Sequence, residues 1–249
     1  MASAPWRTGT VIRILDEPFN TRRFFIEVSE LDAFDFKPGQ FVTLDLPIHE
    51  NKNKRWRSYS IASRPDGTNV FELLIVLLEG GAGTTYLFNQ VQVGSQLVLR
   101  GPQGVFTLPD TIEEDVFFIC TGTGIAPFRS MVHHMAAHQI PHQNIYLIFG
   151  CRTSRDLLYY EELRALENTL AQFLYLPTLS RETWEGNTGY VHGIYESICK
   201  NNTEIVDGIT RVKPALFYLC GWKAMIDDAR KNIAALGYDR KSVRLEVYG

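Results

Sequence analysis

Residues 116–127 read VFFICTGTGIAP, and this stretch decides the fold of the second half of the chain. Its opening run of apolar residues is typical of a strand that is buried on both faces of a parallel sheet. Gly122 and Gly124 then allow the backbone to turn tightly into a helix, whose free amides attract phosphate. The stretch therefore predicts a pyrophosphate-binding turn, although a strand–helix turn also uses glycine for its geometry alone.

Apolar runs and helical segments continue to alternate beyond this turn. Such alternation predicts an α/β domain with a doubly wound parallel sheet. We expect further strands at 145–149, 173–178, 216–220 and 243–247, and helices at 126–137, 160–169, 191–200 and 224–236. The pattern changes near 109–114, which predicts a boundary between a domain of residues 1–110 and a domain of residues 111–249.

The first domain shows a different pattern, in which apolar and polar residues alternate in short runs between turn residues. A period of two is typical of half-buried antiparallel strands. We expect strands at 8–15, 23–28, 40–46, 58–62, 70–77 and 96–101. Short strands at even spacing indicate an antiparallel β-barrel that is closed or nearly closed.

Composition narrows the class of protein. The chain has 249 residues, a formal net charge of −3 and 45% hydrophobic residues, which is typical of a globular protein without affinity for nucleic acid or anionic membranes. Its four cysteines form no Cys-x-x-Cys pair, which argues against a zinc site, an iron–sulfur loop and a disulfide scaffold. No segment resembles a signal peptide or a membrane span, so we expect a cytoplasmic protein.

Arginines follow two of the expected parallel strands. Arg152 comes shortly after the strand at 145–149, and Ser180 and Arg181 follow the next strand. NAD-binding domains carry an acidic residue in this region, whereas an arginine suits the 2′-phosphate of NADP. Guanidinium groups bind phosphate through strong bidentate hydrogen bonds, so this pattern favours NADP. Either arginine taken singly is equally well explained as a solvated loop residue.

A second set of polar residues lies on a strand of the expected barrel, where residues 57–63 read RSYSIAS. Alternation places Arg57 and Tyr59 on one face and the serines on the other. By composition alone this is an ordinary strand with surface serines. Further along, residues 80–87 read GGAGTTYL, a glycine-rich turn before a short helix with a threonine available as its cap. Each domain therefore offers one helix start that can bind an anion.

Five ordered motifs resemble the ferredoxin–NADP(H) reductase family over nearly the whole chain. They are the flavin motif Arg-x-Tyr-Ser with a small residue after it at 57–62, the Gly-x-x-Thr turn at 81–84, the barrel-closing loop at 101–106, the nucleotide turn at 121–127 and Cys-Gly-x-x-x-Met at 220–225. The Glu-Val-Tyr at 246–248 looks like the terminus of the plant-type branch, but Gly249 follows it here. The resemblance implies an FAD-binding barrel and an NADP-binding α/β domain.

The resemblance also implies roles for residues of the first domain. Arg57 would neutralise the FAD pyrophosphate, with Thr84 and the adjoining amides on its other side. Tyr59 would stack on the isoalloxazine ring, and Ser60 would hydrogen-bond to N5, the atom that accepts hydride. The full set of FAD contacts expected here is Arg57, Ser58, Tyr59, Ser60, Ile75, Gly83, Thr84 and Thr85.

In the second domain the family pattern implies three further catalytic residues besides Ser60. Cys220 would flank the contact between the nicotinamide and flavin N5, and Glu246 would orient neighbouring hydroxyl and thiol groups or relay protons. Tyr248 would cover the other flavin face until the nicotinamide enters. Because Gly249 follows Tyr248, the terminal carboxylate is moved one residue outward compared with the family pattern.

The 2′-phosphate site of the plant-type branch matches Ser180, Arg181 and Tyr190. Its lysine has no counterpart between Glu182 and Gly189, so we expect Arg152 to take that place. The other expected nucleotide contacts are Thr123, Gly124, Pro127, Cys220, Gly221 and Met225.

The implied function is hydride transfer between NADPH and FAD, coupled to one-electron exchange with a separate ferredoxin or flavodoxin, in a monomeric enzyme. Alternatives that keep the fold are the reductase component of an oxygenase and an NAD(P)H-dependent flavin or quinone reductase. An alternative of another class is a non-catalytic, dinucleotide-binding regulatory subunit. The cations expected to dock an acidic carrier are Arg22, Arg23, Lys37, Lys52, Lys54 and Arg55.

Overall fold

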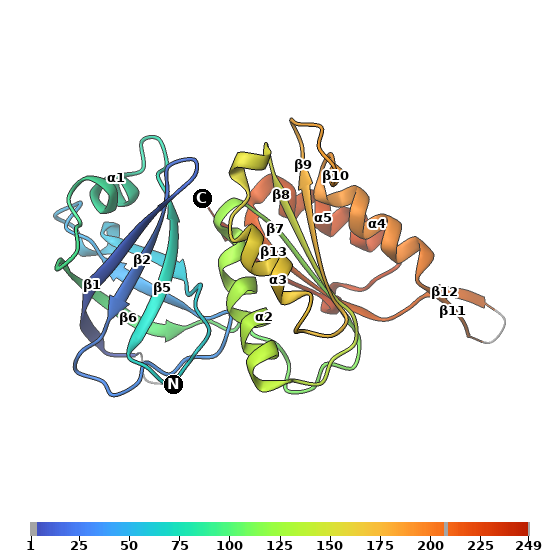
Figure 1. The fold of residues 1–249 in the computed structure, drawn as a ribbon, viewed down its shortest axis with the longest axis horizontal. Coiled ribbons are helices and arrows are strands. Elements are labelled where there is room, and N and C mark those ends of the chain that lie inside the picture. The colour runs from blue at the N-terminus through green and yellow to red at the C-terminus, as the bar shows by residue number, and fades with distance from the viewer. Residues whose placement is uncertain (1–3, 207–208, 249) are drawn as a thin grey trace. The chain divides into compact units, whose positions relative to one another are not determined.

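The computed structural model describes residues 4–206 and 209–248 and divides into two compact units (Figure 1). Unit 1 comprises Met1–Leu108 and Ala126–His134, and unit 2 comprises Pro109–Ile125 and Met135–Gly249. The first residues of one long helix are thus grouped with the N-terminal unit.

Unit 1 is built on a six-stranded antiparallel sheet with the order β4-β3-β6-β1-β2-β5. Its strands are β1 (Trp6–Glu17), β2 (Thr21–Glu27), β3 (Phe41–Asp45), β4 (Trp56–Ser60), β5 (Val70–Val76) and β6 (Gln96–Gln103). The two edge strands meet where Ile61 bridges Leu73 and the Ala62 amide donates to the Glu72 carbonyl over 2.8 Å. The expectation of a nearly closed barrel is confirmed, and each strand end lies within two residues of its predicted position.

Two short helical segments complete this unit, α1 (Ala82–Asn89) and the 3-10 turn η1 (Lys52–Lys54). The expectation that a threonine caps α1 is wrong, because Gly81 occupies the N-cap position and makes no side-chain cap. Thr84 lies inside the first turn instead. Its hydroxyl accepts from the Leu78 amide and donates to the Gly81 carbonyl, each over 3.1 Å, so it ties the loop to the helix.

A buried carboxylate joins three elements of unit 1. Glu72 on β5 is 2% exposed and receives Arg23 Nε at 2.6 Å and Arg129 Nη1 at 3.1 Å. Each charge in such a buried ion pair stabilises the other. Removing one partner is destabilising, because the remaining charge is left unpaired in a poorly solvated site. Arg23 is therefore not an exposed docking cation, which corrects the expectation from sequence. Arg22 and Arg55 are likewise engaged, with Asp16 and Asp45.

Unit 2 is built on a six-stranded parallel sheet with the order β10-β9-β8-β7-β13-β14, which confirms the doubly wound α/β prediction. Its strands are β7 (Asp115–Thr121), β8 (Ile145–Cys151), β9 (Phe173–Leu179), β10 (Asn187–Thr188), β13 (Ala215–Trp222) and β14 (Val243–Tyr248). Its helices are α2 (Ala126–His138), α3 (Tyr160–Leu166), α4 (Val191–Asn201) and α5 (Lys223–Ala235). The 3-10 turns are η2 (Gly122–Ile125), η3 (Ser154–Asp156) and η4 (Arg240–Ser242).

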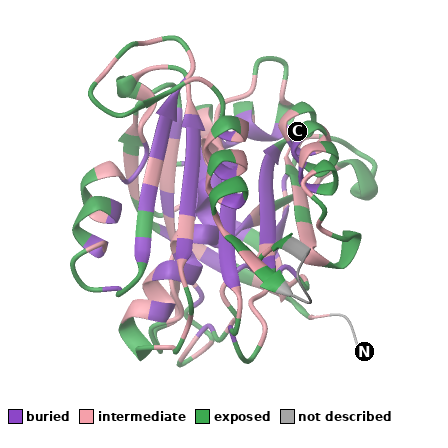
Figure 2. Cartoon of the chain, turned by 90° about the vertical axis from the view of Figure 1, so that its right-hand side faces the viewer, coloured by how far each residue is buried: buried purple, intermediate pink, exposed green. Residues whose placement is uncertain are grey.

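The central strands of this sheet are buried along most of their length, and helices turn their exposed faces outward (Figure 2). Continuous apolar runs fit this environment because both faces of each strand are covered. Helix α3 ends at Leu166 and is shorter than the predicted segment at 160–169. The Thr169 hydroxyl donates to the Leu166 carbonyl over 3.2 Å and so takes the place of a further helical turn.

A two-stranded hairpin between α4 and β13 has no counterpart in the sequence-based assignment. It pairs β11 (Thr203–Val206) with β12 (Ile209–Val212) in antiparallel register. The sequence Asp-Gly at 207–208 is a frequent hairpin signal and could have pointed to this pair of strands. Across the ranges 4–206 and 209–248, no helix is long and apolar enough to span a membrane.

Candidate functional site

The expected flavin residues of unit 1 gather where β4 passes the start of α1. Pairing with β3 sets Arg57 beside Leu44 and Tyr59 beside Val42. Arg57 lies across the first turn of α1, since a Cβ on Gly83 would come within 2.9 Å of its Cγ. Arg57 Nη1 donates hydrogen bonds to the Lys54 carbonyl at 3.1 Å and to the Trp56 carbonyl at 2.8 Å. These bonds hold the guanidinium group beside the helix.

The aromatic and hydroxyl groups of β4 have different surroundings. Tyr59 packs against the barrel core, and burial raises the pKa of its phenol to about 12 although the Arg57 charge opposes this. Its ring therefore stays neutral at any physiological pH, which suits stacking. Ser60 is 4% exposed, whereas Ser58 is exposed and its Oγ lies 3.0 Å from Thr43 Oγ1.

The start of α1 fits a pyrophosphate through its backbone more than through its side chains. Amides in the first turn of a helix have no acceptor within that helix, and they lie here next to Arg57. The Thr84 hydroxyl is already committed to the loop, while Thr85 is exposed. Ile75 stands apart from this group, because its side chain is 2% exposed and packs in the barrel core.

The nucleotide turn of unit 2 follows β7 and continues through η2 into α2. A Cβ on Gly124 would lie 2.3 Å from the Cys220 carbonyl oxygen, so glycine is needed for the turn to lie against β13. Gly221 has a φ of +146° and would place a Cβ 2.5 Å from Thr121 Oγ1. Thr121 Oγ1 is buried and has no hydrogen-bond partner in the described part of the chain. A buried side-chain hydroxyl without a partner is uncommon in folded proteins, and a bound ligand is one way to satisfy it.

Thr123 is half-buried in η2, whereas Pro127 is buried at the start of α2 and is grouped with unit 1. Met225 lies in the first turn of α5 and is half-buried. Thr123 thus belongs to the turn itself, and Met225 begins the helix that follows β13, at the edge of the sheet where its strands end.

Cys220, Glu246 and Tyr248 come together on the two last strands of the sheet. Pairing places Cys220 opposite Glu246 and Trp222 opposite Tyr248. Burial raises the pKa of the Cys220 thiol well above its usual range, and the Glu246 charge adds to this, while a hydrogen bond with Tyr248 opposes it. The thiol is therefore protonated at neutral pH and can donate a hydrogen bond, but it is not a thiolate nucleophile. Gly249 lies outside the described residues.

The expected 2′-phosphate residues meet beyond β8 and β9. The Arg181 amide donates to the Arg152 carbonyl over 2.9 Å, and the Ser180 amide donates to the Cys151 carbonyl over 3.0 Å. Both arginines are exposed, and neither makes an ion pair in residues 4–206 and 209–248. Tyr190, at the N-cap of α4, is 76% exposed.

Glu182 is a neighbour of this cluster that sequence reasoning missed. It accepts hydrogen bonds from the Ser154 amide at 2.8 Å and the Ser154 hydroxyl at 2.9 Å, and these bonds lower the pKa of its carboxyl group. The carboxylate thus ties the loop after β9 to η3. The sequence signal for this role is weak: a glutamate follows the Ser-Arg pair, but its hydrogen-bond partner Ser154 lies 28 residues away in the chain.

The barrel with its Arg-x-Tyr-Ser strand and the parallel sheet with its dinucleotide turn define a flavin- and nicotinamide-nucleotide-dependent oxidoreductase. Residues 10–108 match the oxidoreductase FAD-binding domain, and residues 118–231 match the oxidoreductase NAD-binding domain. The chain is 35% identical to ferredoxin–NADP reductase B of Sorangium cellulosum (strain So ce56) over 235 residues, which cover 93% of this chain and 92% of the relative. The chain belongs to the ferredoxin–NADP(H) reductase family.

Two further similarities are a relative with a different printed role and a solved structure with the same fold. The chain is 34% identical to the anthranilate 1,2-dioxygenase electron transfer component of Acinetobacter baylyi (strain ATCC 33305 / BD413 / ADP1) over 78% of its own length, but spans only 52% of that relative. A ferredoxin NADP+ reductase from Neisseria gonorrhoeae, solved with FAD and NADP, shares the fold with a TM-score of 0.77. It is 24% identical, and the match covers 98% of this chain and 99% of that chain.

Proposed function

We propose that this protein transfers hydride between NADPH and FAD and exchanges single electrons with a separate ferredoxin or flavodoxin. The observation that carries the proposal is the match to a ferredoxin–NADP reductase, which extends along 92% of that relative and 93% of this chain. In this role FAD supplies the ability to take two electrons as hydride and return them one at a time. We further propose that the enzyme is a cytoplasmic monomer.

The chain's own residues would bind and orient the two cofactors. Arg57 and the amides at the start of α1 would hold the FAD pyrophosphate, with Tyr59 as the stacking ring and Ser60 as the hydrogen-bonding group at N5. The turn at 121–127 would hold the nucleotide pyrophosphate. Cys220, protonated because of its burial, would donate toward the nicotinamide from the end of β13. Positioning of this kind accounts for much of the rate in hydride transfer.

Preference for NADPH rests on the two arginines beyond β8 and β9. The Arg181 amide donates to the Arg152 carbonyl over 2.9 Å, so the two residues lie side by side, and we propose that both guanidinium groups bind one 2′-phosphate. Glu182 would repel that phosphate, but its oxygens are directed to Ser154. The net effect favours the phosphorylated nucleotide.

Anaerobic stopped-flow reduction of the FAD-loaded protein tests this preference. We expect flavin absorbance to bleach much faster with NADPH than with NADH, and Arg181→Gln to slow the NADPH reaction about tenfold at subsaturating concentration while leaving NADH unchanged. Arg155→Gln, a neighbouring exposed arginine on η3, is the matched control. Equal rates for the two nucleotides would remove the NADP assignment, and no bleaching by either would overturn the reductase proposal.

A second candidate is the reductase component of an oxygenase. It is favoured by the 34% identity to a dioxygenase electron transfer component, although the chain spans about half of that relative. Reduction of a purified [2Fe–2S] ferredoxin and of a flavodoxin under the same conditions separates the candidates. Rapid turnover with either carrier would support the first proposal, and turnover with neither, despite fast flavin bleaching, would favour the second.

A further inference from the structure

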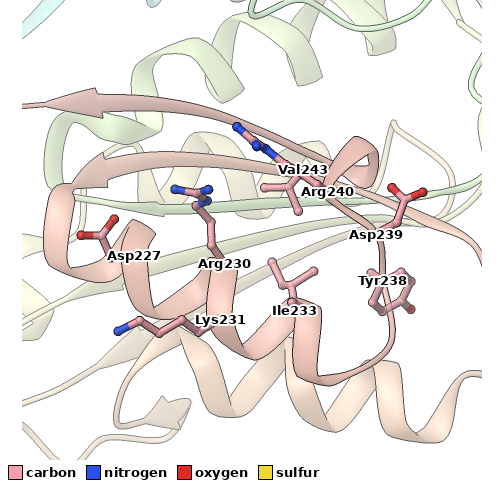
Figure 3. Close-up of a pocket in the computed structure, with 9 residues that line it drawn as sticks. Asp227, Arg230, Lys231, Ile233, Tyr238, Asp239, Arg240 and Val243 are labelled. Atoms are coloured by element: carbon pink, nitrogen blue, oxygen red, sulfur yellow. The ribbon is translucent and has the colours of Figure 1, made fainter.

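A hollow of about 470 Å³ lies between α5, η4 and the beginning of β14 (Figure 3). Ile233 and Val243 belong to its apolar lining, and Tyr238 stands beside them. The Tyr238 ring is held edge-on against Phe217 at 4.7 Å, and its hydroxyl donates to the Lys213 carbonyl over 3.0 Å. This volume falls within the range of small-molecule sites, and the contacts of Tyr238 hold its ring in place beside the hollow.

The hollow lies away from the nucleotide turn. Val243 pairs with Phe217 at the beginning of β14 and β13, whereas Cys220 pairs with Glu246 farther along both strands. Parallel strands all run toward the edge of the sheet that carries the nucleotide turn, so Val243 marks the opposite edge. None of the residues assigned above to FAD or to the nucleotide lines this hollow.

Positive charge is available at two sides of the hollow. Arg230 comes from α5 and Arg240 from η4, and both guanidinium groups lie to the left of Val243 in Figure 3. Both side chains are exposed, and neither makes a hydrogen bond or an ion pair with any other described residue. An unpaired guanidinium group over an apolar surface is a ready donor for an oxyanion.

The acidic residues around the hollow are committed elsewhere. Asp227 is bonded to Lys223, one turn earlier on α5. Asp239 caps η4 and accepts from the Lys241 amide at 2.6 Å and the Ser242 amide at 3.2 Å. Asp227 also attracts Arg230 and Lys231 through its charge, but no hydrogen bond or ion pair joins Asp227 or Asp239 to Arg230 or Arg240 in the described residues.

We propose that this hollow binds a phosphomonoester with a flat apolar body. A phosphomonoester carries a charge of about −1.5 to −2 at neutral pH and three acceptor oxygens, which matches two guanidinium groups better than a single carboxylate does. Its body would rest on Val243 and Ile233 beside the Tyr238 ring. The site is separate from the nucleotide turn, so both are occupied at the same time.

The test titrates AMP into the full-length, FAD-loaded protein that is already saturated with the pyridine nucleotide it binds, by isothermal titration calorimetry. We expect one AMP to bind per chain and adenosine, which lacks the phosphate, not to bind. The double variant Arg230→Gln/Arg240→Gln should weaken AMP binding at least tenfold. Arg211→Gln, an exposed arginine on β12, should leave it unchanged and is the matched control.

Three results would overturn the proposal. They are the absence of AMP binding to the unaltered protein, equal binding of AMP and adenosine, and AMP binding that survives the double substitution. Because both arginines are exposed, the double variant is expected to fold, and its flavin absorbance and melting temperature check this. Its bleaching by NADPH should match that of the unaltered protein, so failure at this site is distinguished from failure of the reductase proposal.

Discussion

Cys220 shows how neighbours decide the chemistry of a residue. Its place before Gly221 at the end of a strand was visible in the sequence, but its protonation state was not. That state depends on burial, on Glu246 and on Tyr248, which β14 brings beside it. Sequence separation hides such contacts, and the same is true of Glu182 with Ser154 and of Arg23 with Glu72.

We predict that Cys220→Ala slows flavin reduction by NADPH about 10- to 100-fold, because the nicotinamide loses a contact that positions it. FAD content should not change, since Cys220 belongs to unit 2. The measurement is the stopped-flow bleaching rate at saturating NADPH. Cys199→Ala, which alters another buried cysteine on α4, is the control and should keep the normal rate. Equal rates for the two variants would remove Cys220 from the catalytic set.

At the scale of elements, most strands and helices could be predicted because each has a clear period. The apolar runs at β7 and β8 indicated buried parallel strands, and the alternation at β1 and β2 indicated half-buried ones. The β11–β12 hairpin was missed because its strands are short and stand outside both large sheets. The local signal for it in the sequence is the Asp-Gly dipeptide at 207–208.

A substitution in the nucleotide turn tests how closely this turn must approach β13. Gly124→Ala would put a Cβ 2.3 Å from the Cys220 carbonyl oxygen, so either the turn or β13 must move. We expect the variant to lose NADPH binding by more than tenfold and about 2 kcal/mol or more of stability, as backbone clashes in packed regions do. Binding is measured by difference absorbance, and stability by denaturant unfolding.

Gly122→Ala is the matched control two residues earlier. Gly122 has a φ of +54°, and a Cβ added there would meet nothing within 4 Å, so the substitution costs only the left-handed backbone preference, about 1 kcal/mol. A Gly122→Ala variant as damaged as Gly124→Ala would show that close approach to β13 is not the reason for glycine at 124.

At the scale of the whole molecule, buried tyrosine and cysteine side chains with raised pKa values make the stability of the fold decrease at alkaline pH. Burial raises the pKa of Tyr59 and Tyr218 to about 12, of Cys151 to about 12 and of Cys199 to about 11. In an unfolded chain these groups titrate near 10 for tyrosine and about 8.5 for cysteine, by ordinary values. At a pH between the unfolded-state and the folded-state pKa values, the folded protein binds more protons than the unfolded chain. Its free energy of unfolding therefore decreases as the pH rises.

We therefore predict a melting temperature that is flat with respect to these groups below about pH 8.5 and falls steadily toward pH 12. Differential scanning calorimetry in matched ionic strength measures it. In Tyr218→Phe the melting temperature should fall less steeply with pH, because one group with a raised pKa has been removed. At neutral pH its melting temperature should be lower, because the variant loses the 2.9 Å hydrogen bond from Arg244. A melting temperature unchanged up to about pH 11.5 would contradict the prediction.

The two-unit architecture was largely predictable, because the change from period-two alternation to long apolar runs falls between the barrel and the parallel sheet. The grouping of residues Ala126–His134 of α2 with the barrel was not. It depends on Arg129 reaching Glu72 and the Ala62 carbonyl, contacts 57 and 67 residues apart in the chain. Patterns within a segment carry no information about such pairings.

Strand β14 follows every other described strand in chain order, yet it supplies the two residues that lie beside Cys220. A ribosome therefore completes strands β1 to β6 on the order of ten seconds before it adds Glu246 and Tyr248, at ordinary rates of synthesis. The strands of the barrel can pair during that interval, while the parallel sheet still lacks its edge strand. Synthesis thus completes the strands of the barrel before it completes the edge strand of the parallel sheet.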